Sequence, residues 1–566
     1  MNFSFNLINT GQKNWSYMLL LLFITSFVNL NAQQCGFNYV AGDGCSNTNY
    51  ANFGFYSNND PATIEYDNII SAFHATIVRN SNGSFSVWGD CMANDGTASV
   101  LTPQEVNSNN YPALGSHKVL KATLASNGVQ QTILLTSDGL YTWGLVGQAF
   151  NSTLKSTPAF GRVANTNGST TSNLPPGVTP ADVKMLTASS SGLSTGGNII
   201  LTTCRGEVWA LATDASVRGD GPSPAITNNL SWSQVKKSAG VPLTNIVAAR
   251  INRNFVIALD SNNTLWTWGT LANVGDNTNA ELKNYATQMV HPDATKNIKM
   301  IGVTSGFSEL KPSYYVLMTD GNMYSLGVNT SRQLGDWSNT ERRSWIQPRY
   351  NGATGLVMNN IKWISPQEND ENFAAINVIT NNGNLYAWGY NNYSMLGSST
   401  IGTLNPFIPS GLSSSDKIIA VETGGHTSMI IKECSSNFGY AGHSIRGSMA
   451  NGIAADAQTT SYTFATAPVN ICGASSINLT INVQAQNLNG DYCTSSSFLL
   501  SASPSGGTFS VVSGSANINS SNIISFSGSG TVVISYTLPS SGCVGSAAEY
   551  ALTVVDCCPV LTPISN

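Results

Sequence analysis

Residues 379–397 read ITNNGNLYAWGYNNYSMLG and contain the pattern on which the rest of the chain is organised. An apolar run leads into a turn at Asn382-Gly383, and an aromatic run that includes Trp388 follows it and ends at Gly389. Asn-Gly between two β-rich runs predicts a hairpin, because both central positions of the favoured two-residue turn require positive φ. The stretch therefore predicts two antiparallel strands joined by a tight turn.

Degraded copies of this hairpin occur seven times between about residue 64 and residue 450. Each copy has a short apolar strand, a turn, and an aromatic strand that ends in Trp-Gly or a substitute. The residues at the Trp position, spaced 52 to 68 residues apart, are Trp88, Trp143, Leu211, Trp268, Leu326, Trp388 and Tyr440. A third apolar run precedes most copies, and no helical periodicity is present. One such sheet cannot bury its faces, whereas seven sheets around an axis can, so the pattern predicts an all-β, seven-bladed β-propeller.

The repeated unit resembles the repeat of the RCC1 (regulator of chromosome condensation) family. Residues 319–336, 380–397 and 136–148 match that repeat best, and Gly424-Gly425-His426-Thr427 matches its "GxxHTxAL" position, as does His74. The resemblance implies a seven-bladed RCC1-like propeller, which we expect to span residues 33–452. Leu211, Leu326 and Tyr440 depart from the family at the Trp position.

The character of the sequence changes after the last repeat. Residues 453–466 are interpreted as a linker, and residues 467–566 contain about six alternating strands with Pro-Ser-Gly and Ser-Gly turns. These strands predict a C-terminal β-sandwich. The module resembles the Ig-like or PKD-like domains of secreted bacterial surface proteins. The sequence leaves open whether the chain is complete at its C-terminus.

The first 32 residues have the features of a secretory signal. Lys13 precedes the apolar run MLLLLFITSFV at residues 18–28, and the sequence NLNA offers a small-residue cleavage site after Ala32. No later segment reaches 18 consecutive apolar residues, so no transmembrane span is expected in the mature chain. We expect a secreted or cell-surface protein that is monomeric.

The ten cysteines all follow this cleavage site, and an even number in an exported chain favours disulfides. Cys35 with Cys45 is a plausible local bridge. The adjacent Cys557 and Cys558 need different partners, for which the candidates are Cys472, Cys493 and Cys543. No CxxC pair and no histidine at zinc-finger spacing is present, so the sequence predicts no structural zinc site.

The composition excludes several classes of protein. Charged residues make up 10% of the chain, against roughly 25% in an average soluble domain. Aromatic residues are 9% and the formal net charge is −5, which together favour a folded protein over a disordered one. No basic run is present, so nucleic acid is not expected as a partner.

The motifs of enzymes occur only out of context. Residues 192–196 match GxSxG and residues 152–155 match SxxK, but no helix is expected after either of them, as both motifs require. His74 and His426 are interpreted as repeat residues that make inter-strand hydrogen bonds. The sequence therefore predicts no catalytic, cofactor-binding or metal-binding residues. An enzyme acting at the propeller axis would need His, Arg or acidic side chains that converge there.

The loops between repeats carry the candidate binding residues, which are Trp232, Trp337, Trp345, Tyr390 and Tyr393. Exposed aromatic side chains on a rigid scaffold provide contact area at low entropic cost. They predict a scaffold that binds an extracellular or cell-surface protein or glycan through its rim loops.

Two alternatives come from resemblance. The chain is similar to propeller-class β-lactamase inhibitory proteins, which implies a secreted inhibitor of an extracellular enzyme. Such an inhibitor is expected to concentrate exposed aromatic residues at one end of the propeller. The eukaryotic namesake of the RCC1 family implies guanine-nucleotide exchange activity, and the export signal argues against that function.

Overall fold

The computed structural model describes residues 66, 68–80, 83–166, 169–193, 196–222, 229–305, 311–370, 373–432, 437–469, 490–502, 507–537 and 547–557. The chain divides into two compact units, one containing the described residues 66–469 and the other containing the described residues 490–557. The predicted signal sequence and the predicted bridge between Cys35 and Cys45 lie outside the described residues. No helix in the described ranges is long and apolar enough to cross a membrane.

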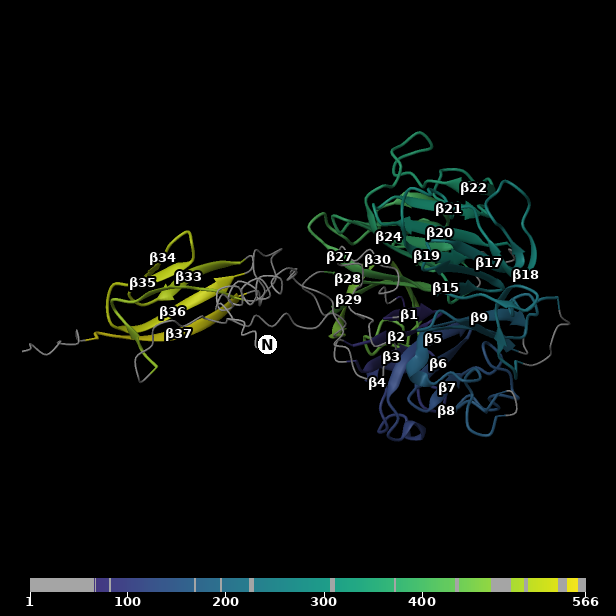
Figure 1. Ribbon diagram of the computed structural model, residues 1–566, viewed down its shortest axis with the longest axis horizontal. Helices are drawn as coiled ribbons and strands as arrows, with labels where there is room; N and C mark the ends of the chain where they lie inside the picture. The colour runs from purple at the N-terminus through teal and green to yellow at the C-terminus, as the bar shows by residue number, and fades with distance from the viewer. Residues whose placement is uncertain are drawn as a thin grey trace, which may run out of the picture. The chain divides into compact units, whose positions relative to one another are not determined.

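The first unit contains seven four-stranded antiparallel sheets among its described residues, and we call them blades 1 to 7 in chain order (Figure 1). The strands of blades 1 to 3 are β1 (Ile69–Ala72), β2 (Ala75–Arg79), β3 (Phe85–Gly89), β4 (Val100–Glu105); β5 (Val119–Ser126), β6 (Gln130–Thr136), β7 (Gly139–Gly144), β8 (Gly161–Arg162); and β9 (Val183–Leu193), β10 (Gly196–Thr203), β11 (Val208–Ala212), β12 (Ser233–Gln234). The strands of blades 4 and 5 are β15 (Ile246–Asn252), β16 (Phe255–Asp260), β17 (Leu265–Ala272), β18 (Glu281–Gln288); and β19 (Ile298–Thr304), β20 (Ser313–Met318), β21 (Met323–Gly327), β22 (Arg342–Ile346).

Blades 6 and 7 complete the set. Their strands are β23 (Ile361–Pro366), β24 (Ala375–Thr380), β25 (Leu385–Asn391), β26 (Gly402–Phe407); and β27 (Ile418–Thr423), β28 (Thr427–Lys432), β29 (Asn437–Ser444), β30 (Ala457–Pro468). A separate hairpin of β13 (Lys236–Ser238) and β14 (Val241–Pro242) lies beside β18. In the described ranges, three short 3₁₀ helices occupy loops: η2 (Pro112–Leu114), η3 (Pro180–Asp182) and η4 (Asn392–Ser394).

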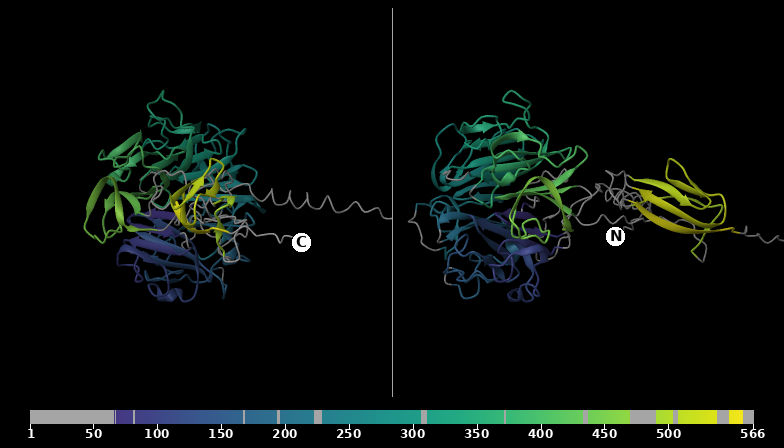
Figure 2. Two further views of the ribbon diagram at one scale, coloured as in Figure 1. Left: turned by 90° about the vertical axis from the view of Figure 1, so that its left-hand side faces the viewer. Right: turned by 180° about the vertical axis from the view of Figure 1, so that it is seen from behind.

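The seven blades form a closed ring. The first strand of each blade contacts the first strand of the next, and β27 of blade 7 contacts β1 of blade 1. In the left panel of Figure 2 the colours run around this unit from purple through blue and teal to green, so that the last blade lies beside the first. The hydrophobic core lies between neighbouring blades, and one buried cluster combines residues of blades 7, 1 and 2. The all-β, RCC1-like propeller prediction is confirmed.

The hairpin at residues 379–397 forms as predicted, but its turn differs from the predicted two-residue type. Thr380 and Asn384 pair through the Thr380 N–H and the Asn384 carbonyl at 2.9 Å, so three residues form the loop. Only Gly383 among them has positive φ, at 80°. A three-residue hairpin loop needs one left-handed residue before the second strand, whereas the two-residue turn needs two.

Where a blade has the repeat tryptophan, the indole connects it to the blade before it. The indole N–H of Trp143, Trp268 and Trp388 donates to the carbonyl of Met92, Val217 and Gln333, respectively, at 2.8–3.2 Å. Gly335, with φ of 72°, lies flat against Trp388, and a Cβ there would be 2.9 Å from the indole ring. The segment Gln333-Leu334-Gly335 of blade 5 therefore accommodates the tryptophan of the following blade.

The seam between blade 7 and blade 1 follows the same rule. Trp88 of blade 1 donates to the Ser448 carbonyl of blade 7 at 3.1 Å, and its ring stacks on Phe438 at 5.0 Å. Arg446 also forms an ion pair with Asp90 across the seam at 2.7 Å. Every described sheet of the ring consists of consecutive strands. Among the described residues, side-chain contacts and a backbone hydrogen bond from the Gly452 N–H to the Leu101 carbonyl at 3.0 Å, rather than a shared strand, therefore join the last blade to the first.

The predicted linker at residues 453–466 is wrong over most of its length. Ala457–Pro468 forms β30, the outermost strand of blade 7, and pairs with β29. The segment AQTTSYTFATAP is rich in Ser, Thr and Ala because an outer strand buries few side chains, which makes it similar to a linker in composition. Tyr462 is its buried anchor, with 4% of its surface exposed.

Asp336 lies in the loop between β21 and β22, next to Gly335, which packs against Trp388. Burial alone would raise the pKa of this carboxyl, but hydrogen bonds from Ser338 and Arg342 outweigh burial and lower it. The carboxylate therefore stabilises the folded state above about pH 4, and this contribution is lost as the pH falls through the lowered folded-state pKa. We expect Asp336→Asn to lower the free energy of unfolding by about 1 kcal/mol at pH 7, because Arg342 is partly exposed. In urea unfolding, the difference in unfolding free energy between the wild type and Asp336→Asn should become smaller below pH 4. A difference that stays constant from pH 7 to pH 3 would contradict this role.

The second unit contains two sheets that share one core. One sheet has the order β31 (Tyr492–Cys493), β37 (Ala547–Val555), β36 (Gly530–Thr537), β33 (Thr508–Ser513), and the other has the order β32 (Ser497–Leu499), β35 (Ile523–Phe526), β34 (Ala516–Ile518). Buried side chains from both sheets, such as Phe498 and Ile534, form a single cluster. Cys493 and Cys557 form a disulfide, so Cys557 has one of its three predicted partners. The similarity to Ig-like domains stays a prediction.

Candidate functional site

The five aromatic candidates fall into different environments. Trp232 is only 5% exposed and donates its indole N–H to the Asn173 carbonyl at 2.9 Å, so it is a core residue and its predicted exposure is wrong. Trp337 and Trp345 are half-buried, and their indole groups donate to the carbonyls of Arg349 and Val290. The loop position of Trp232 was visible in the sequence, whereas the packing of the loop onto its blade was not.

Tyr390 and Tyr393 are the two candidates that lie together. Tyr390 lies in β25 of blade 6 and Tyr393 lies in η4, directly after that strand. Both pack against Phe373, with ring centroids 5.6 and 6.4 Å away. Tyr393 has φ of 53° and stacks on His443, with the ring planes 3° apart and the centroids 4.6 Å apart. The left-handed backbone at Tyr393 therefore places its ring against a histidine of the next blade.

Three histidines meet beside Tyr393. His74 lies in the turn between β1 and β2, His426 precedes β28, and His443 is in β29. His74 Nε2 is 2.8 Å from His443 Nδ1 and 3.0 Å from His426 Nδ1. All three side chains are at most 9% exposed. The inter-strand hydrogen bonds predicted for His74 and His426 are thus contacts between imidazoles of two blades.

The surroundings of these histidines keep two of them neutral. Burial lowers the pKa of His74 to about 2 and that of His426 to about 3, and the neighbouring imidazoles add to both shifts. The other ring nitrogen of His443, Nε2, is 2.8 Å from the Asp456 carboxylate. Phe73 covers His74 at a centroid distance of 3.9 Å. The group is therefore an apolar-walled set of imidazoles with one carboxylate behind it.

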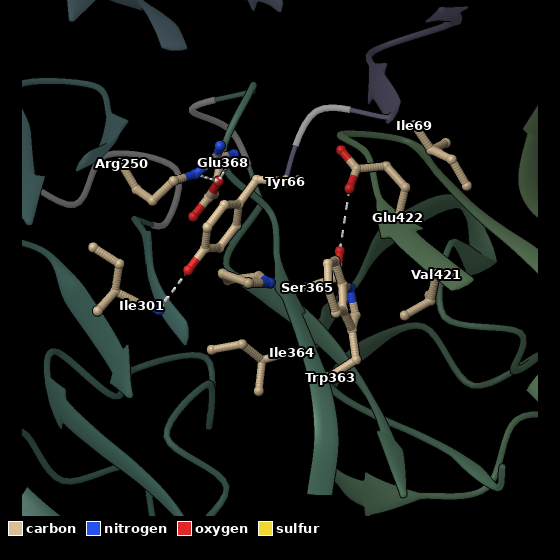
Figure 3. Close-up of a pocket in the computed structure, with 11 residues that line it drawn as sticks. Tyr66, Ile69, Arg250, Ile301, Trp363, Ile364, Ser365, Glu368, Val421 and Glu422 are labelled. Carbon is tan, nitrogen blue, oxygen red and sulfur yellow. Dashed lines mark hydrogen bonds and ion pairs between the residues drawn. The ribbon is translucent and has the colours of Figure 1, made fainter. Parts of the chain in front are cut away.

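Charged groups also converge near the propeller axis (Figure 3). Arg250 of blade 4 forms an ion pair with Glu368, which follows β23 of blade 6, and the side chain of each is 6% exposed. The ring of Tyr66 lies 5.1 Å from the Arg250 guanidinium, and the hydroxyl of Tyr66 accepts the Ile301 N–H. The Glu422 carboxylate accepts a hydrogen bond from Ser365.

These axial groups are arranged to hold blades together. The cavity that they line has a volume of about 20 Å³, which is room for about one water molecule. Asp370 of blade 6 forms a bridge with Ser126 of blade 2, so the segment after β23 crosses the axis. An arginine and acids do converge here, as an axial enzyme would need, but the arginine and Glu368 satisfy each other.

The lysine of the SxxK match has a structural role. Lys155 Nζ donates to the carbonyls of Thr157 and Ala159 at 2.7 and 2.6 Å, and the residues around it form turns. This environment fixes the loop between β7 and β8. Part of the GxSxG match lies outside the described residues.

Cys91 is a free thiol, so the even pairing of cysteines expected from the sequence does not extend to it. Burial raises its pKa to about 12, and the adjacent Asp90 carboxylate adds to the shift. At pH 8 the thiolate fraction is then about 10⁻⁴, against about one in four for an ordinary thiol. We expect a disulfide-exchange reagent to label Cys91 more than about 100-fold faster in denaturant than in buffer. Peptide mass spectrometry would follow the labelling, with Cys91→Ser as the control. Equal labelling rates in buffer and in denaturant would contradict the half-buried placement of Cys91.

Exposed aliphatic side chains are distributed unevenly around the ring. In the described part of the propeller, eight large aliphatic residues are at least 41% exposed: Leu145, Val241, Leu282, Val290, Leu356, Ile401, Ile408 and Ile453. Six of them, from Val241 to Ile408, lie on or beside β18, on either side of β26, or in the loop between β22 and β23. We call these six residues the blade 4–6 patch. Sequence periodicity did not reveal it, because four of the six residues lie in loops and only Val241 and Leu282 lie in strands.

A surface cavity adjoins this patch. It has a volume of about 410 Å³, and it is lined by the turn between β16 and β17 and by residues 288–291. Val290 lines it, and Trp345 of blade 5 donates to the Val290 carbonyl at 2.7 Å. Asn263 and His291 contribute polar atoms and hydrogen-bond to each other at 3.0 Å. The cavity therefore combines apolar and polar groups next to one predicted binding residue.

Residues 382–431 match the family described as the regulator of chromosome condensation (RCC1) repeat. The chain carries an RCC1 repeat. The match contains β25 to β28 and includes Trp388 and His426. It extends from the hairpin turn of blade 6 to the second strand of blade 7, so it places the family repeat across a boundary between blades.

Solved structures similar to this chain include one of human WBSCR16 and two of yeast Prp20. Human WBSCR16 shares 14% identity, with 65% of this chain and 86% of that chain covered and a TM-score of 0.47. Prp20p from Saccharomyces cerevisiae, whose structure is described together with its binding properties to Gsp1p and histones, shares 17% identity. The match covers 64% of this chain and 81% of that chain, with a TM-score of 0.46. Yeast RCC1 (Prp20), in a structure of Kap60 bound to it, shares 13% identity, with 77% and 90% covered and a TM-score of 0.47.

Proposed function

We propose that this protein is a secreted or cell-surface scaffold that binds an extracellular protein through the outer surface of blades 4 to 6. The observation that carries the proposal is the uneven distribution of exposed aliphatic side chains, six of eight in that arc of the ring. An RCC1-like propeller is suited to this role because its rigid sheets hold loops from several blades in fixed positions.

The chemistry of the blade 4–6 patch favours a protein over a glycan. Leu356 is 82% exposed and Ile408 is 57% exposed, and such side chains stabilise an interface by leaving water. Single exposed aliphatic residues are common, but their concentration in one region is typical of interaction surfaces. Trp345, beside the cavity, adds the kind of aromatic side chain that contributes strongly to interfaces.

Export is part of the proposal. The apolar run at residues 18–28 and the NLNA sequence before Gln33 support a cleaved signal, and the Cys493–Cys557 disulfide fits an oxidising compartment. We expect the protein recovered outside the producing cell to begin at Gln33. Intact-mass measurement of that material is the check, and a secreted chain that retains residues 1–32 would contradict the signal assignment.

The binding test compares variants that remove exposed side chains. The full chain would be immobilised and exposed to extracellular and envelope proteins from its own source, and retained proteins would be titrated by surface plasmon resonance. We expect one saturable partner, whose affinity falls at least about 10-fold in Leu356→Asp and in Ile408→Asp.

The matched controls are Leu145→Asp and Ile453→Asp, which make the same kind of change in blades 2 and 7. We expect both controls to bind as the wild type does. Equal losses in all four variants, or no saturable partner, would contradict the proposed surface.

We do not propose the alternative function, inhibition of an extracellular enzyme. An inhibitor is expected to have the aromatic candidates gathered at one end of the ring. The structure brings Tyr390 and Tyr393 together and buries Trp232, while Trp345 lies beside Val290 of blade 4.

A further inference from the structure

We propose that His74, His426 and His443 bind one divalent transition-metal ion, with Zn²⁺ as the preferred ion, and that this ion fastens blade 7 to blade 1. The ligand atoms are His74 Nε2, His426 Nδ1 and His443 Nδ1, which lie within 4.8 Å of one another. The inference does not depend on the proposed function, because it concerns the seam of the ring and not the blade 4–6 patch.

The first argument is proton accounting at the three nitrogens. A neutral imidazole carries one proton, and the proton of His443 is placed on Nε2 by the Asp456 carboxylate 2.8 Å away. His443 Nδ1 then presents a lone pair toward His74 Nε2. His74 Nε2 also faces His426 Nδ1, and a single proton between three nitrogens satisfies one good hydrogen bond at most. A cation in the middle accepts all three lone pairs at once.

The second argument is the ligand set. Three imidazoles without a thiolate suit Zn²⁺, Cu²⁺ or Ni²⁺ and not the oxygen-preferring Mg²⁺ or Ca²⁺. Tetrahedral Zn²⁺ with Zn–N distances of about 2.0–2.1 Å separates its ligands by about 3.3 Å. His74 and His443 would then part by about half an ångström, and His426 and His443, whose ligand atoms lie within 4.8 Å, would approach by up to about 1.5 Å.

The third argument is the shell around the three rings. A metal-bound histidine commonly donates its other N–H to a carboxylate, which orients the ring and makes it more basic. Asp456 occupies that position for His443. Phe73, Phe373 and Tyr393 pack against the imidazoles at centroid distances of 3.9, 4.8 and 4.3 Å, and they shield the site from water.

The location explains what the ion would do. His74 belongs to blade 1, whereas His426 and His443 belong to blade 7. No strand is shared across this seam among the described residues, so side-chain contacts and the backbone hydrogen bond from Gly452 to Leu101 hold it closed. An ion with ligands from both blades would oppose opening of the ring at the place where the two ends of the propeller chain meet.

The test uses the chain's five histidines as an internal set. The purified full chain would be stripped with a chelator, equilibrated with Zn²⁺, and analysed for metal by mass spectrometry, with Co²⁺ absorption as a second probe of the site. We expect one equivalent of Zn²⁺ that is lost in His426→Ala and His443→Ala. His117 and His291 lie outside the site, so His117→Ala and His291→Ala should retain the bound Zn²⁺.

The histidine variants could lose zinc because they fail to fold, so Asp456→Asn is a second test. The Asp456 side chain is 70% exposed, and its replacement should leave folding intact. We expect this variant to bind Zn²⁺ about 10- to 100-fold more weakly than the wild type while folding normally. Zn²⁺ should also raise the thermal unfolding midpoint of the wild type and of His117→Ala, and leave that of His443→Ala unchanged. Absence of stoichiometric Zn²⁺ in the wild type, or its retention in His443→Ala, would overturn the proposal.

Discussion

Replacing Glu368 with alanine is expected to lower the free energy of unfolding by about 3–5 kcal/mol, because it removes the carboxylate from a buried ion pair with Arg250. The side chains of both residues are 6% exposed, and the pair connects blade 4 to blade 6 near the axis. Chemical denaturation of the full chain, followed by tryptophan fluorescence, is the measurement. A loss below about 1 kcal/mol would place the pair in a solvent-screened setting, contrary to the structure.

The matched control removes both charges. In the double variant Arg250→Met with Glu368→Leu, apolar side chains of similar size replace the pair, and such replacements are often neutral. We therefore expect the double variant to be more stable than Glu368→Ala alone. If the double variant is less stable than Glu368→Ala, the two charges stabilise the fold by more than neutralising each other.

Replacing Trp88 with alanine is the second large effect, with an expected loss of about 3–5 kcal/mol. The indole is fully buried, stacks on Phe438 and donates to Ser448 across the seam between blades 1 and 7. The half-buried Trp345 is the control, and Trp345→Ala should cost less because its ring keeps solvent contact. Thermal unfolding of the two variants checks the order, and an equal loss would contradict the role of Trp88 in closing the ring.

The repeated parts of the fold were predictable because they rest on local patterns. Each hairpin shows its turn and its aromatic strand within about 15 residues, so Trp143, Trp268 and Trp388 identified their blades directly. The turn type was not predictable from Asn382-Gly383, since the same pair suits both a two-residue and a three-residue loop. The strand β30 was missed because an outer strand has a polar composition.

The candidate sites depended on contacts between distant residues. His74 and His443 are 369 positions apart, and Arg250 and Glu368 are 118 apart, so no spacing in the sequence related them. The equivalent positions His74 and His426 in the first and last repeats were the available signal, since a ring of repeats brings its two ends together. His443 had no such signal, and its contribution depended on the closed ring.

Hydrogen–deuterium exchange of the full chain, with and without the partner captured by it, tests the central claim most directly. The proposed function predicts slower exchange on binding in β18, β22 and β26 and in the loop that contains Leu356. It predicts unchanged exchange in blades 1 to 3. Protection confined to blades 1 to 3, or to the axial segment around Asp370, would contradict a binding surface on blades 4 to 6.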